Sequence, residues 1–314
     1  MTSIVPLIAA LVLSVPCIYW TQGPSTRATL EAAGLKALCV PADQAESWRA
    51  AGVQVTAVSE AELAAREALP TPGVTVRAGV ASPTRAPWIV ANRWRMTRRT
   101  AVKYAYTPAP GAGALAAAEA YAYGADAIIR IDPADVNAVA GMLTFLQGLA
   151  SADLPAVADF GIVDDGSAVT GEVMNLLSRR NLLYKIVPSP SPQFPLNVVI
   201  GSREYPAQEA ADPSAFALRV RRDLTDDRRS LRIYGSEVVI GRLTGSGGRA
   251  RLHLINYGGR EIQGLRIRVR GAFPTGDALV SGVGHVSLDD RSVAEGATEF
   301  SLARLTTYAV IDLR

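Results

Sequence analysis

Three carboxylates directly follow strand-like runs of apolar residues, and these are the side chains best suited to acid–base chemistry. Asp132 follows the run 127–131, and Asp164 and Asp165 follow the run 157–163. Two carboxyl groups on either side of one bond can act as general acid and general base. Each also has a structural explanation, because Asp132 stands at a helix N-cap position and the Asp pair opens a turn.

A second group of residues combines aromatic rings with arginine and amide side chains. It consists of Trp88, Asn92, Arg95, Tyr104 and Tyr106. Flat aromatic faces can stack on the C–H surfaces of sugars, and Arg and Asn can hydrogen-bond to hydroxyl groups. We therefore predict a carbohydrate-binding cleft bordered by this group together with Asp132. The alternative is that the two tryptophans of this segment belong to the core while its arginines face solvent.

The histidine and cysteine content excludes several other chemistries. Two His and two Cys cannot build a His/Cys zinc site or a disulfide framework, and we expect neither Cys17 nor Cys39 to need a partner. No His precedes His253, so a Ser–His–Asp triad is excluded from the first part of the chain. We predict no metal. The net charge of +3 is too small to indicate a nucleic-acid partner.

An Ala-rich helix near residue 120 carries two further candidates. Gly111, Gly113 and Ala116 match the G-x-G-x-x-A spacing of dinucleotide-binding turns, but two prolines separate them from the preceding strand. We therefore expect no cofactor. Glu119 lies inside the same helix, and we expect it on the surface.

The elements that would position these residues change character along the chain. Residues 18–190 alternate short apolar strands with helices, which predicts a parallel sheet with helical crossovers. After a helix over 212–224, short strands recur with Gly-rich turns between them, which is typical of an antiparallel sandwich. The composition, 49% hydrophobic and 19% charged, is that of a globular protein, and 314 residues are enough for two domains.

Three segments carry a family resemblance. The stretch 250–258, with its Asn-Tyr pair, and the final strand 307–313, with Tyr-x-Val, are similar to the sandwich that ends many glycoside hydrolases. The stretch 157–187 resembles an amidotransferase-like βαβ module. The stretch 118–129 resembles the last helix–strand unit of a glycosidase barrel. Their order is that of multidomain β-galactosidases.

The resemblance implies an α/β fold, with a compact or truncated barrel-like parallel domain followed by a C-terminal antiparallel β-sandwich. The expected parts are a signal peptide or anchor over 1–16, the barrel-like domain over 17–150, the amidotransferase-like module over 151–200, and the sandwich over 201–314. A complete barrel of this kind takes about 250 residues. The barrel is therefore expected to be truncated.

The resemblance also implies glycoside hydrolysis, in which Asp132 would pair with Asp164 or Asp165 across roughly 5–9.5 Å. No Glu lies at a predicted strand end before residue 200, so the usual pair is not evident. Two hypotheses follow. The protein is either a glycoside-hydrolase-like enzyme of reduced size acting on carbohydrate, or a non-catalytic carbohydrate-binding or structural protein of the cell envelope.

The N-terminal stretch Ile4–Val15 has no charge and the length of a signal-peptide apolar region. It predicts an extracytoplasmic location, whether secreted, periplasmic or membrane-anchored, and this segment could associate with a membrane. The alternative is a buried first strand with an apolar lead-in. The chain could also form a homo-oligomer, which the sequence does not decide.

Overall fold

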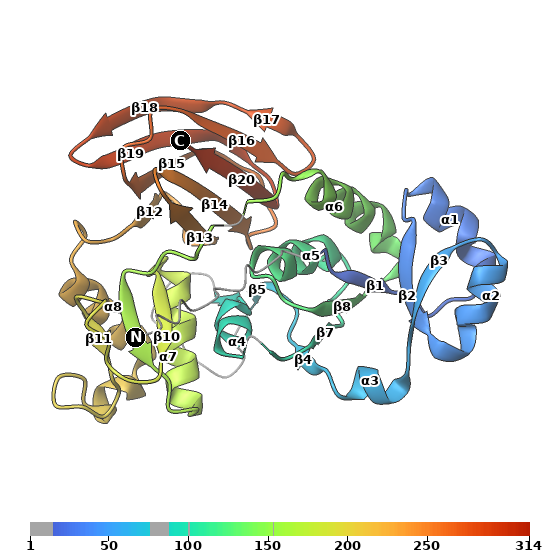
Figure 1. Cartoon of the computed structure of the whole chain (residues 1–314), viewed down its shortest axis with the longest axis horizontal. Helices are drawn as coiled ribbons and strands as arrows, with labels where there is room; N and C mark the ends of the chain where they lie inside the picture. The colour runs from blue at the N-terminus through green and yellow to red at the C-terminus, as the bar shows by residue number, and fades with distance from the viewer. Residues whose placement is uncertain (1–14, 76–87, 100, 153) are drawn as a thin grey trace, which may run out of the picture.

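The computed structural model describes residues 15–75, 88–99, 101–152 and 154–314. Figure 1 shows a parallel α/β part, a small second α/β module and an antiparallel sandwich. The predicted fold class, a parallel α/β domain followed by an antiparallel sandwich, is confirmed. The apolar N-terminal segment Ile4–Val15 lies almost entirely outside the described residues. No helix within the described ranges is long and apolar enough to cross a membrane.

The first part is built on a six-stranded sheet in which every pair of neighbours is parallel. Its strands are β1 (Cys17–Tyr19), β2 (Ala37–Pro41), β3 (Gln54–Val58), β4 (Glu67–Leu69), β7 (Tyr104–Tyr106) and β8 (Ala127–Arg130). Their order is β3-β2-β1-β8-β7-β4. This is the sequential order of an α/β barrel, cut open between β3 and β4. Over the described residues these two strands form the free edges of the sheet.

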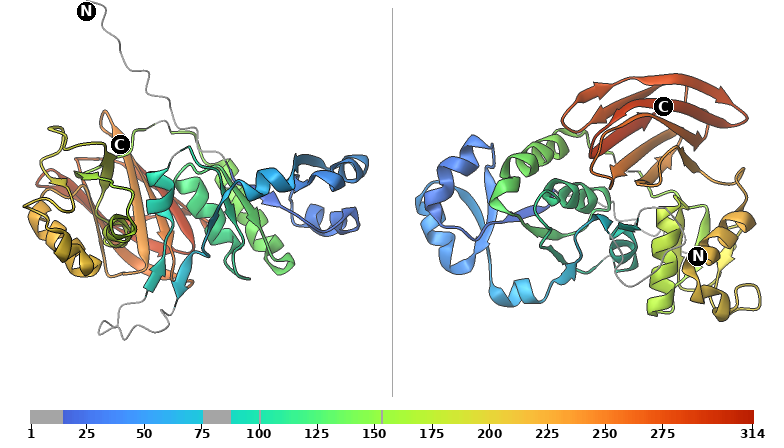
Figure 2. Two further views of the ribbon diagram at one scale, coloured as in Figure 1. Left: turned by 90° about the horizontal axis from the view of Figure 1, so that it is seen from below. Right: turned by 180° about the vertical axis from the view of Figure 1, so that it is seen from behind.

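The helices of this part pack on both faces of the sheet. They are α1 (Arg27–Ala32), α2 (Ala45–Ala50), α3 (Glu60–Ala64), α4 (Arg93–Arg98), α5 (Gly113–Ala122) and α6 (Val136–Gly148). The alternation of strand side chains explains the packing, since Ile18, Trp20, Leu38 and Val40 enter the core shared with the helices. Figure 2 shows β2, β3, α1 and α2 projecting to one side as an arm. A short antiparallel pair, β5 (Gly73–Thr75) and β6 (Trp88–Val90), precedes α4.

The second module has its own parallel sheet and core. It contains β9 (Phe160–Val163), α7 (Ala168–Arg179), β10 (Tyr184–Val187), β11 (Asn197–Val198) and α8 (Pro213–Leu224). The strand order is β10-β9-β11. Helix α8 falls within the range expected for the sandwich, yet its apolar residues pack in the same cluster as those of α7 and β9. The predicted domain limits stay a prediction.

The sandwich consists of two antiparallel sheets, with strand orders β12-β15-β19-β18 and β13-β14-β20-β16-β17. Its strands are β12 (Leu231–Tyr234), β13 (Val239–Ser246), β14 (Arg249–Asn256), β15 (Ile262–Arg270), β16 (Gly276–Val280), β17 (Gly284–Val286), β18 (Leu288–Ala294), β19 (Ala297–Leu305) and β20 (Tyr308–Leu313). The Asn-Tyr pair shapes the turn after β14. The Asn256 amide donates to the carbonyls of Arg260 and Thr306, both at 2.7 Å.

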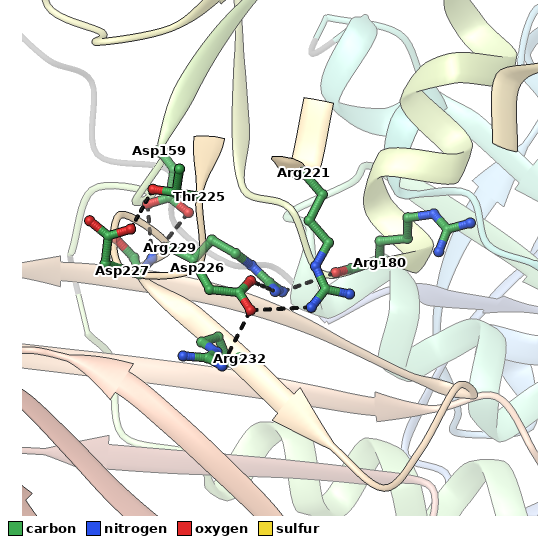
Figure 3. Close-up of polar contacts among 9 residues, drawn as sticks. Asp159, Arg180, Arg221, Thr225, Asp226, Asp227, Arg229 and Arg232 are labelled. Carbon is green, nitrogen blue, oxygen red and sulfur yellow. Dashed lines mark hydrogen bonds and ion pairs between the residues drawn. The ribbon is translucent and has the colours of Figure 1, made fainter. Parts of the chain in front are cut away.

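A cluster of arginines around one carboxylate joins the second module to the sandwich (Figure 3). Asp226, in the loop between α8 and β12, accepts from Arg229 at 3.0 Å, Arg221 at 3.3 Å and Arg232 at 3.4 Å. Arg229 also donates to the backbone carbonyl of Arg180, just after α7, at 3.2 Å. The loop is thereby fixed against the end of α7.

Cys17 and Cys39 form a disulfide that joins β1 to β2. The expectation that neither cysteine needs a partner is wrong. It failed because the parallel pairing places Cys39 opposite Tyr19, which brings residues 22 positions apart in the chain onto adjacent strands.

We expect replacement of both cysteines by alanine to lower the free energy of unfolding by about 3 kcal/mol, because the unfolded chain regains the entropy of a closed loop. Chemical denaturation of the oxidised wild type and the double variant measures the difference. A reductant should destabilise the wild type and leave the double variant unchanged. Equal stability of the two proteins would contradict this prediction.

Candidate functional site

The carboxyl ends of the strands in the six-stranded sheet gather one set of polar side chains. Ligands of parallel α/β sheets and barrels bind beyond these ends. Tyr19 ends β1 and pairs in register with Arg130, which ends β8. Asp43 lies in the short 3-10 helix after β2, and Glu60 is the first residue of α3 after β3. We call Tyr19, Asp43, Glu60 and Arg130 the mouth site.

The charges of the mouth site act on the Tyr19 phenol. Burial raises the pKa of Tyr19, the positive charge of Arg130 opposes this rise, and the negative charges of Asp43 and Glu60 add to it. Charge interactions of this kind fade beyond about 10 Å at 0.1 M salt. The mouth site therefore combines two carboxylates, a guanidinium and a phenol from four neighbouring elements.

This set suits the recognition of a ligand rich in hydroxyl groups. The carboxylates accept hydrogen bonds, the guanidinium donates them, and the phenol can do both. Asp43, Glu60 and Arg130 are exposed. A glycosidase general acid, in contrast, acquires its raised pKa from burial in an apolar pocket. The sequence argument missed both carboxylates because it considered the last residue of each strand and not the first turn that follows it.

Asp132 lies just beyond Arg130, and its main contact is local. Its Oδ1 accepts the backbone N–H of Ala134 at 2.8 Å, as the N-cap of a 3-10 helix. Asp135 caps α5 by accepting the N–H groups of Gly111 at 2.8 Å and Gly113 at 3.2 Å. A dinucleotide phosphate bound at the G-x-G-x-x-A turn would need these two N–H groups, which already donate to Asp135. Across the described ranges, no group of three or more His, Cys, Asp or Glu could hold a metal.

Glu119 on α5 is fully buried, so the expectation of a surface position is wrong. Its carboxylate accepts four hydrogen bonds. Asn92 donates its backbone N–H at 2.6 Å and its amide at 3.0 Å, Tyr106 donates at 2.6 Å, and Tyr257 donates at 2.7 Å. Burial raises the pKa of Glu119, and these hydrogen bonds work against the rise. Because Tyr257 follows β14, one carboxylate joins the barrel-like part to the sandwich.

Three of the five predicted binding residues are interior. Asn92 and Tyr106 belong to the Glu119 network, and Tyr104 donates to the backbone carbonyls of Arg95 and Arg99 at 3.0 and 3.1 Å. These three side chains do not border an open cleft. Their role in carbohydrate binding stays a prediction.

The other two predicted binding residues, Trp88 and Arg95, are half-buried, and each takes part in a cation–π pair. The guanidinium carbon of Arg95 lies 4.2 Å from the ring centroid of Trp94, and that of Arg179 lies 4.4 Å from the ring centroid of Trp88. Trp88 and Trp94 pack against the apolar cluster of the second module. Both tryptophans therefore contribute to docking of the module, whereas the expectation that the arginines of this segment face solvent is wrong, since Arg93 is buried and Arg98 binds Asp164.

Asp164 and Asp165 lie at the end of β9, in the three-stranded sheet of the second module, whereas Asp132 follows the six-stranded sheet. Arg98 from α4 holds Asp164 through two hydrogen bonds of 2.6 Å. Burial alone would raise the pKa of Asp164, but the bonds from Arg98 and the Gly166 N–H lower it. Asp165 accepts the backbone N–H of Ser167 at 2.9 Å. Pairing of these residues with Asp132 in catalysis stays a prediction.

Comparisons with known proteins found similar folds only among solved structures. No family model and no curated protein matches the chain. Among solved structures, α-L-fucosidase isoenzyme 2 from Paenibacillus thiaminolyticus matches with a TM-score of 0.55 at 9% identity, over 87% of this chain and 71% of that chain. The cold-adapted β-galactosidase from Rahnella sp. R3 matches with a TM-score of 0.45 at 9% identity, over 88% and 63%. A GH42 β-galactosidase from G. stearothermophilus matches with a TM-score of 0.42 at 8% identity, over 68% and 54%.

The similarity to the fucosidase shows that the chain has a glycoside-hydrolase-like fold, as the sequence resemblance implied. At this level of identity the likeness concerns the fold alone. The chain spans 63% and 54% of the two β-galactosidases.

Replacing Glu119 by Gln should lower the free energy of unfolding by about 2–4 kcal/mol. The NH₂ group of Gln cannot accept a hydrogen bond, so some of the donors from Asn92, Tyr106 and Tyr257 would be left buried without an acceptor. Urea denaturation at pH 7 measures this. Glu31→Gln, on the exposed surface of α1, serves as the matched control and should change stability by about 0.5 kcal/mol or less. Equal effects of the two substitutions would show that the Glu119 network contributes no more than a surface contact.

Replacing Asp164 by Asn should cost about 2 kcal/mol at pH 7, because two hydrogen bonds from a charged donor are weakened. A carboxyl group whose folded-state pKa is lowered stabilises the protein above its unfolded pKa of about 3.9 and loses this effect as the pH falls. The difference between wild type and variant should therefore shrink below about pH 4. Urea denaturation at pH 7 and pH 3 tests this, with Asp289→Asn as the exposed control. A difference independent of pH would refute it.

Proposed function

We propose that the protein binds carbohydrate at the mouth site and does not hydrolyse it. The observation that carries the proposal is the gathering of Tyr19, Asp43, Glu60 and Arg130 beyond the carboxyl ends of the parallel strands, in a fold shared with glycoside hydrolases. In such a sheet, loops and helix starts converge on a ligand at this edge. The mouth site offers acceptors and donors for hydroxyl groups and no metal-ligating cluster among the described residues.

Two features favour binding over hydrolysis. Among the described residues the barrel is open between β3 and β4, and the two mouth-site carboxylates are exposed, so neither lies in the dry pocket that tunes a glycosidase acid. The competing proposal is hydrolysis by Asp132 with Asp164 or Asp165. The pairing with Asp164 is disfavoured because both of its oxygens already accept hydrogen bonds from Arg98.

An extracytoplasmic location is part of the same proposal. The uncharged segment Ile4–Val15 supports export. The disulfide Cys17–Cys39 supports an oxidising compartment, because such bonds are rare in reducing cytosol.

A glycan array probed with the purified protein should show retention of a defined set of glycans. Arg130→Gln should weaken the affinity for them at least tenfold, since the variant loses a charge-assisted donor worth about 1.5–3 kcal/mol. Arg49→Gln, exposed on α2, is the matched control and should bind as the wild type does.

Three outcomes would contradict the proposal. Retention unchanged in Arg130→Gln would place binding elsewhere. Loss of retention in Trp88→Ala alone would move the site to the segment first predicted from the sequence. Release of reducing ends from a retained glycan, abolished by Asp132→Asn, would show an active hydrolase.

A further inference from the structure

The outer face of the four-stranded sheet carries a group of arginines where it meets the loop after α8. Strand β15 turns Arg268 and Arg270 outward, because residues that alternate with them, Ile267 and Val269, pack in the core of the sandwich. Strand β12 adds Arg232, which pairs in register with Arg268. The end of α8 and the loop that follows it supply two more. We call Arg221, Arg228, Arg232, Arg268 and Arg270 the arginine face.

The arginine face has fewer counter-charges than guanidinium groups. Like charges directly opposite each other on neighbouring strands are destabilising, so this arrangement needs carboxylates nearby. Glu299 on β19 pairs with Arg268 at 3.3 Å and also with Arg266 at 3.2 Å. Asp226 is shared in the same way by three arginines (Figure 3). Five guanidinium groups therefore share two carboxylates.

Arg228 and Arg270 bring two further positive charges beside this cluster. Both residues are exposed, and the Arg270 guanidinium donates to the backbone carbonyl of Arg228 at 3.5 Å. Neither side chain forms an ion pair with another described residue, although Asp227 is close. The hydrogen bond from Thr225 lowers the pKa of Asp227, and the charges of Arg228 and Arg270 lower it further. These two guanidinium groups are therefore the ones that a ligand from solvent would reach first.

Positive charge exceeds negative charge around the arginine face. Together with the buried Arg229 there are six guanidinium groups, and the carboxylates among them are Asp159, Asp226, Asp227 and Glu299. This excess of two is most of the net charge of +3 that the whole chain carries. Asp289 and Asp290 lie on β18, at the opposite edge of the same sheet. An anion is therefore attracted to the side of the sheet formed by β12 and β15.

The pKa of Arg229 reflects the same surplus. Burial lowers the pKa of this guanidinium, its bond to Asp226 opposes the fall, and the positive charges of Arg221 and Arg232 lower the pKa further. A bound anion would offset this repulsion without displacing the carboxylate that is already present.

The arginines keep donors for such an anion. A guanidinium has five N–H donors in a planar fork, which matches the oxygens of a carboxylate or a similar oxyanion. Arg221 and Arg232 each use one long contact to Asp226, of 3.3 and 3.4 Å, and their side chains are 44% and 24% exposed. Their remaining N–H groups can therefore bind a second anionic group beside Arg228 and Arg270.

The spacing of the charges favours a polymer that carries its acidic groups far apart. Arg268 and Arg270 are two residues apart on one strand, which is about 7 Å. Duplex DNA carries one charge per roughly 1.7 Å and would press phosphates against Asp226 and Asp227. A polysaccharide with one acidic group per sugar ring is charged more sparsely, so its acidic groups can meet guanidinium groups and its hydroxyl groups can meet the carboxylates.

We propose that the arginine face binds an acidic polysaccharide through carboxylate or sulfate groups. Arg228 and Arg270 hold one acidic group, and Arg221 and Arg232 hold the next. The choice of a saccharide among polyanions rests on the proposed function, whereas the excess of guanidinium groups does not. The arginine face shares no residue with the mouth site, which belongs to the six-stranded sheet.

Titration of the full chain at low salt with polygalacturonate, dextran sulfate and neutral dextran tests the proposal. We expect one of the two acidic polymers to bind at least tenfold more tightly than neutral dextran, and the pair distinguishes carboxylate from sulfate. The double variant Arg228→Gln/Arg270→Gln should weaken this binding at least tenfold. Absence of binding to both acidic polymers would overturn the proposal.

The matched control is the double variant Arg249→Gln/Arg260→Gln. It removes the same two charges from exposed positions at the start of β14 and in the turn after it, outside the arginine face. It should bind the acidic polymer as the wild type does. Equal weakening in the two double variants would show attraction by net charge alone and overturn the site. Duplex DNA that binds as tightly as the polymer, with the same loss in Arg228→Gln/Arg270→Gln, would overturn the assignment to a saccharide.

Thermal melting followed by circular dichroism should give equal midpoints for the two double variants. If Arg228→Gln/Arg270→Gln melts at a lower temperature, the single variant Arg228→Gln decides, because the Arg228 side chain forms no hydrogen bond with another described residue. It should still weaken binding at least threefold, and unchanged binding would overturn the proposal.

The mouth-site variant separates this inference from the proposed function. Arg130→Gln should lose retention of neutral glycans on the array and keep its affinity for the acidic polymer. Loss of acidic-polymer binding in Arg130→Gln would place that binding at the mouth site and overturn the arginine face. Acidic-polymer binding that depends on Arg228 and Arg270, without retention of any neutral glycan, would overturn the mouth site and leave the arginine face supported.

Discussion

The burial of one carboxylate, Glu119, constrains how the barrel-like part and the sandwich meet. A buried charge is tolerated only where donors surround it. Here the donors come from three separate segments: the loop before α4, strand β7 and the turn after β14. Each segment must reach its place for the carboxylate to be satisfied. The network therefore gives a unique arrangement to a junction that apolar packing alone would fix less sharply.

The remaining junctions use the same chemistry with arginine as the donor. Of the 32 basic residues only three are lysine, at positions 36, 103 and 185. Arg98 reaches from α4 to Asp164 of the second module with both arms of its guanidinium. Arg251 of the sandwich does the same to Asp312 while donating to the carbonyl of Ala150 at 2.6 Å. A planar fork holds two partners at once, which an ammonium group does less well.

Much of the fold was predictable because local patterns agree with it. The alternation of strand and helix and the density of short C-terminal strands both have direct counterparts in the structure. The interior position of Glu119 was not recognised, although the helix around it is apolar on every side and such a helix is buried. The disulfide could not be predicted, because it depends on the register between β1 and β2. The mouth site was missed because its carboxylates, Asp43 and Glu60, come from the first turn after each strand.

The disulfide also bears on the order in which the sheet can assemble. Strand β1 lies between β2, which follows it closely in the chain, and β8, whose register partner for Tyr19 is Arg130. A chain emerging from its N-terminus would present both cysteines, 22 positions apart, long before β8 exists. The first cross-strand pairing can then be locked while the second still awaits a distant segment. Slow, non-local strand pairing is the step that limits folding of parallel sheets. In an oxidising compartment, this covalent bond would fix the local pairing of β1 with β2 before the distant pairing with β8 forms.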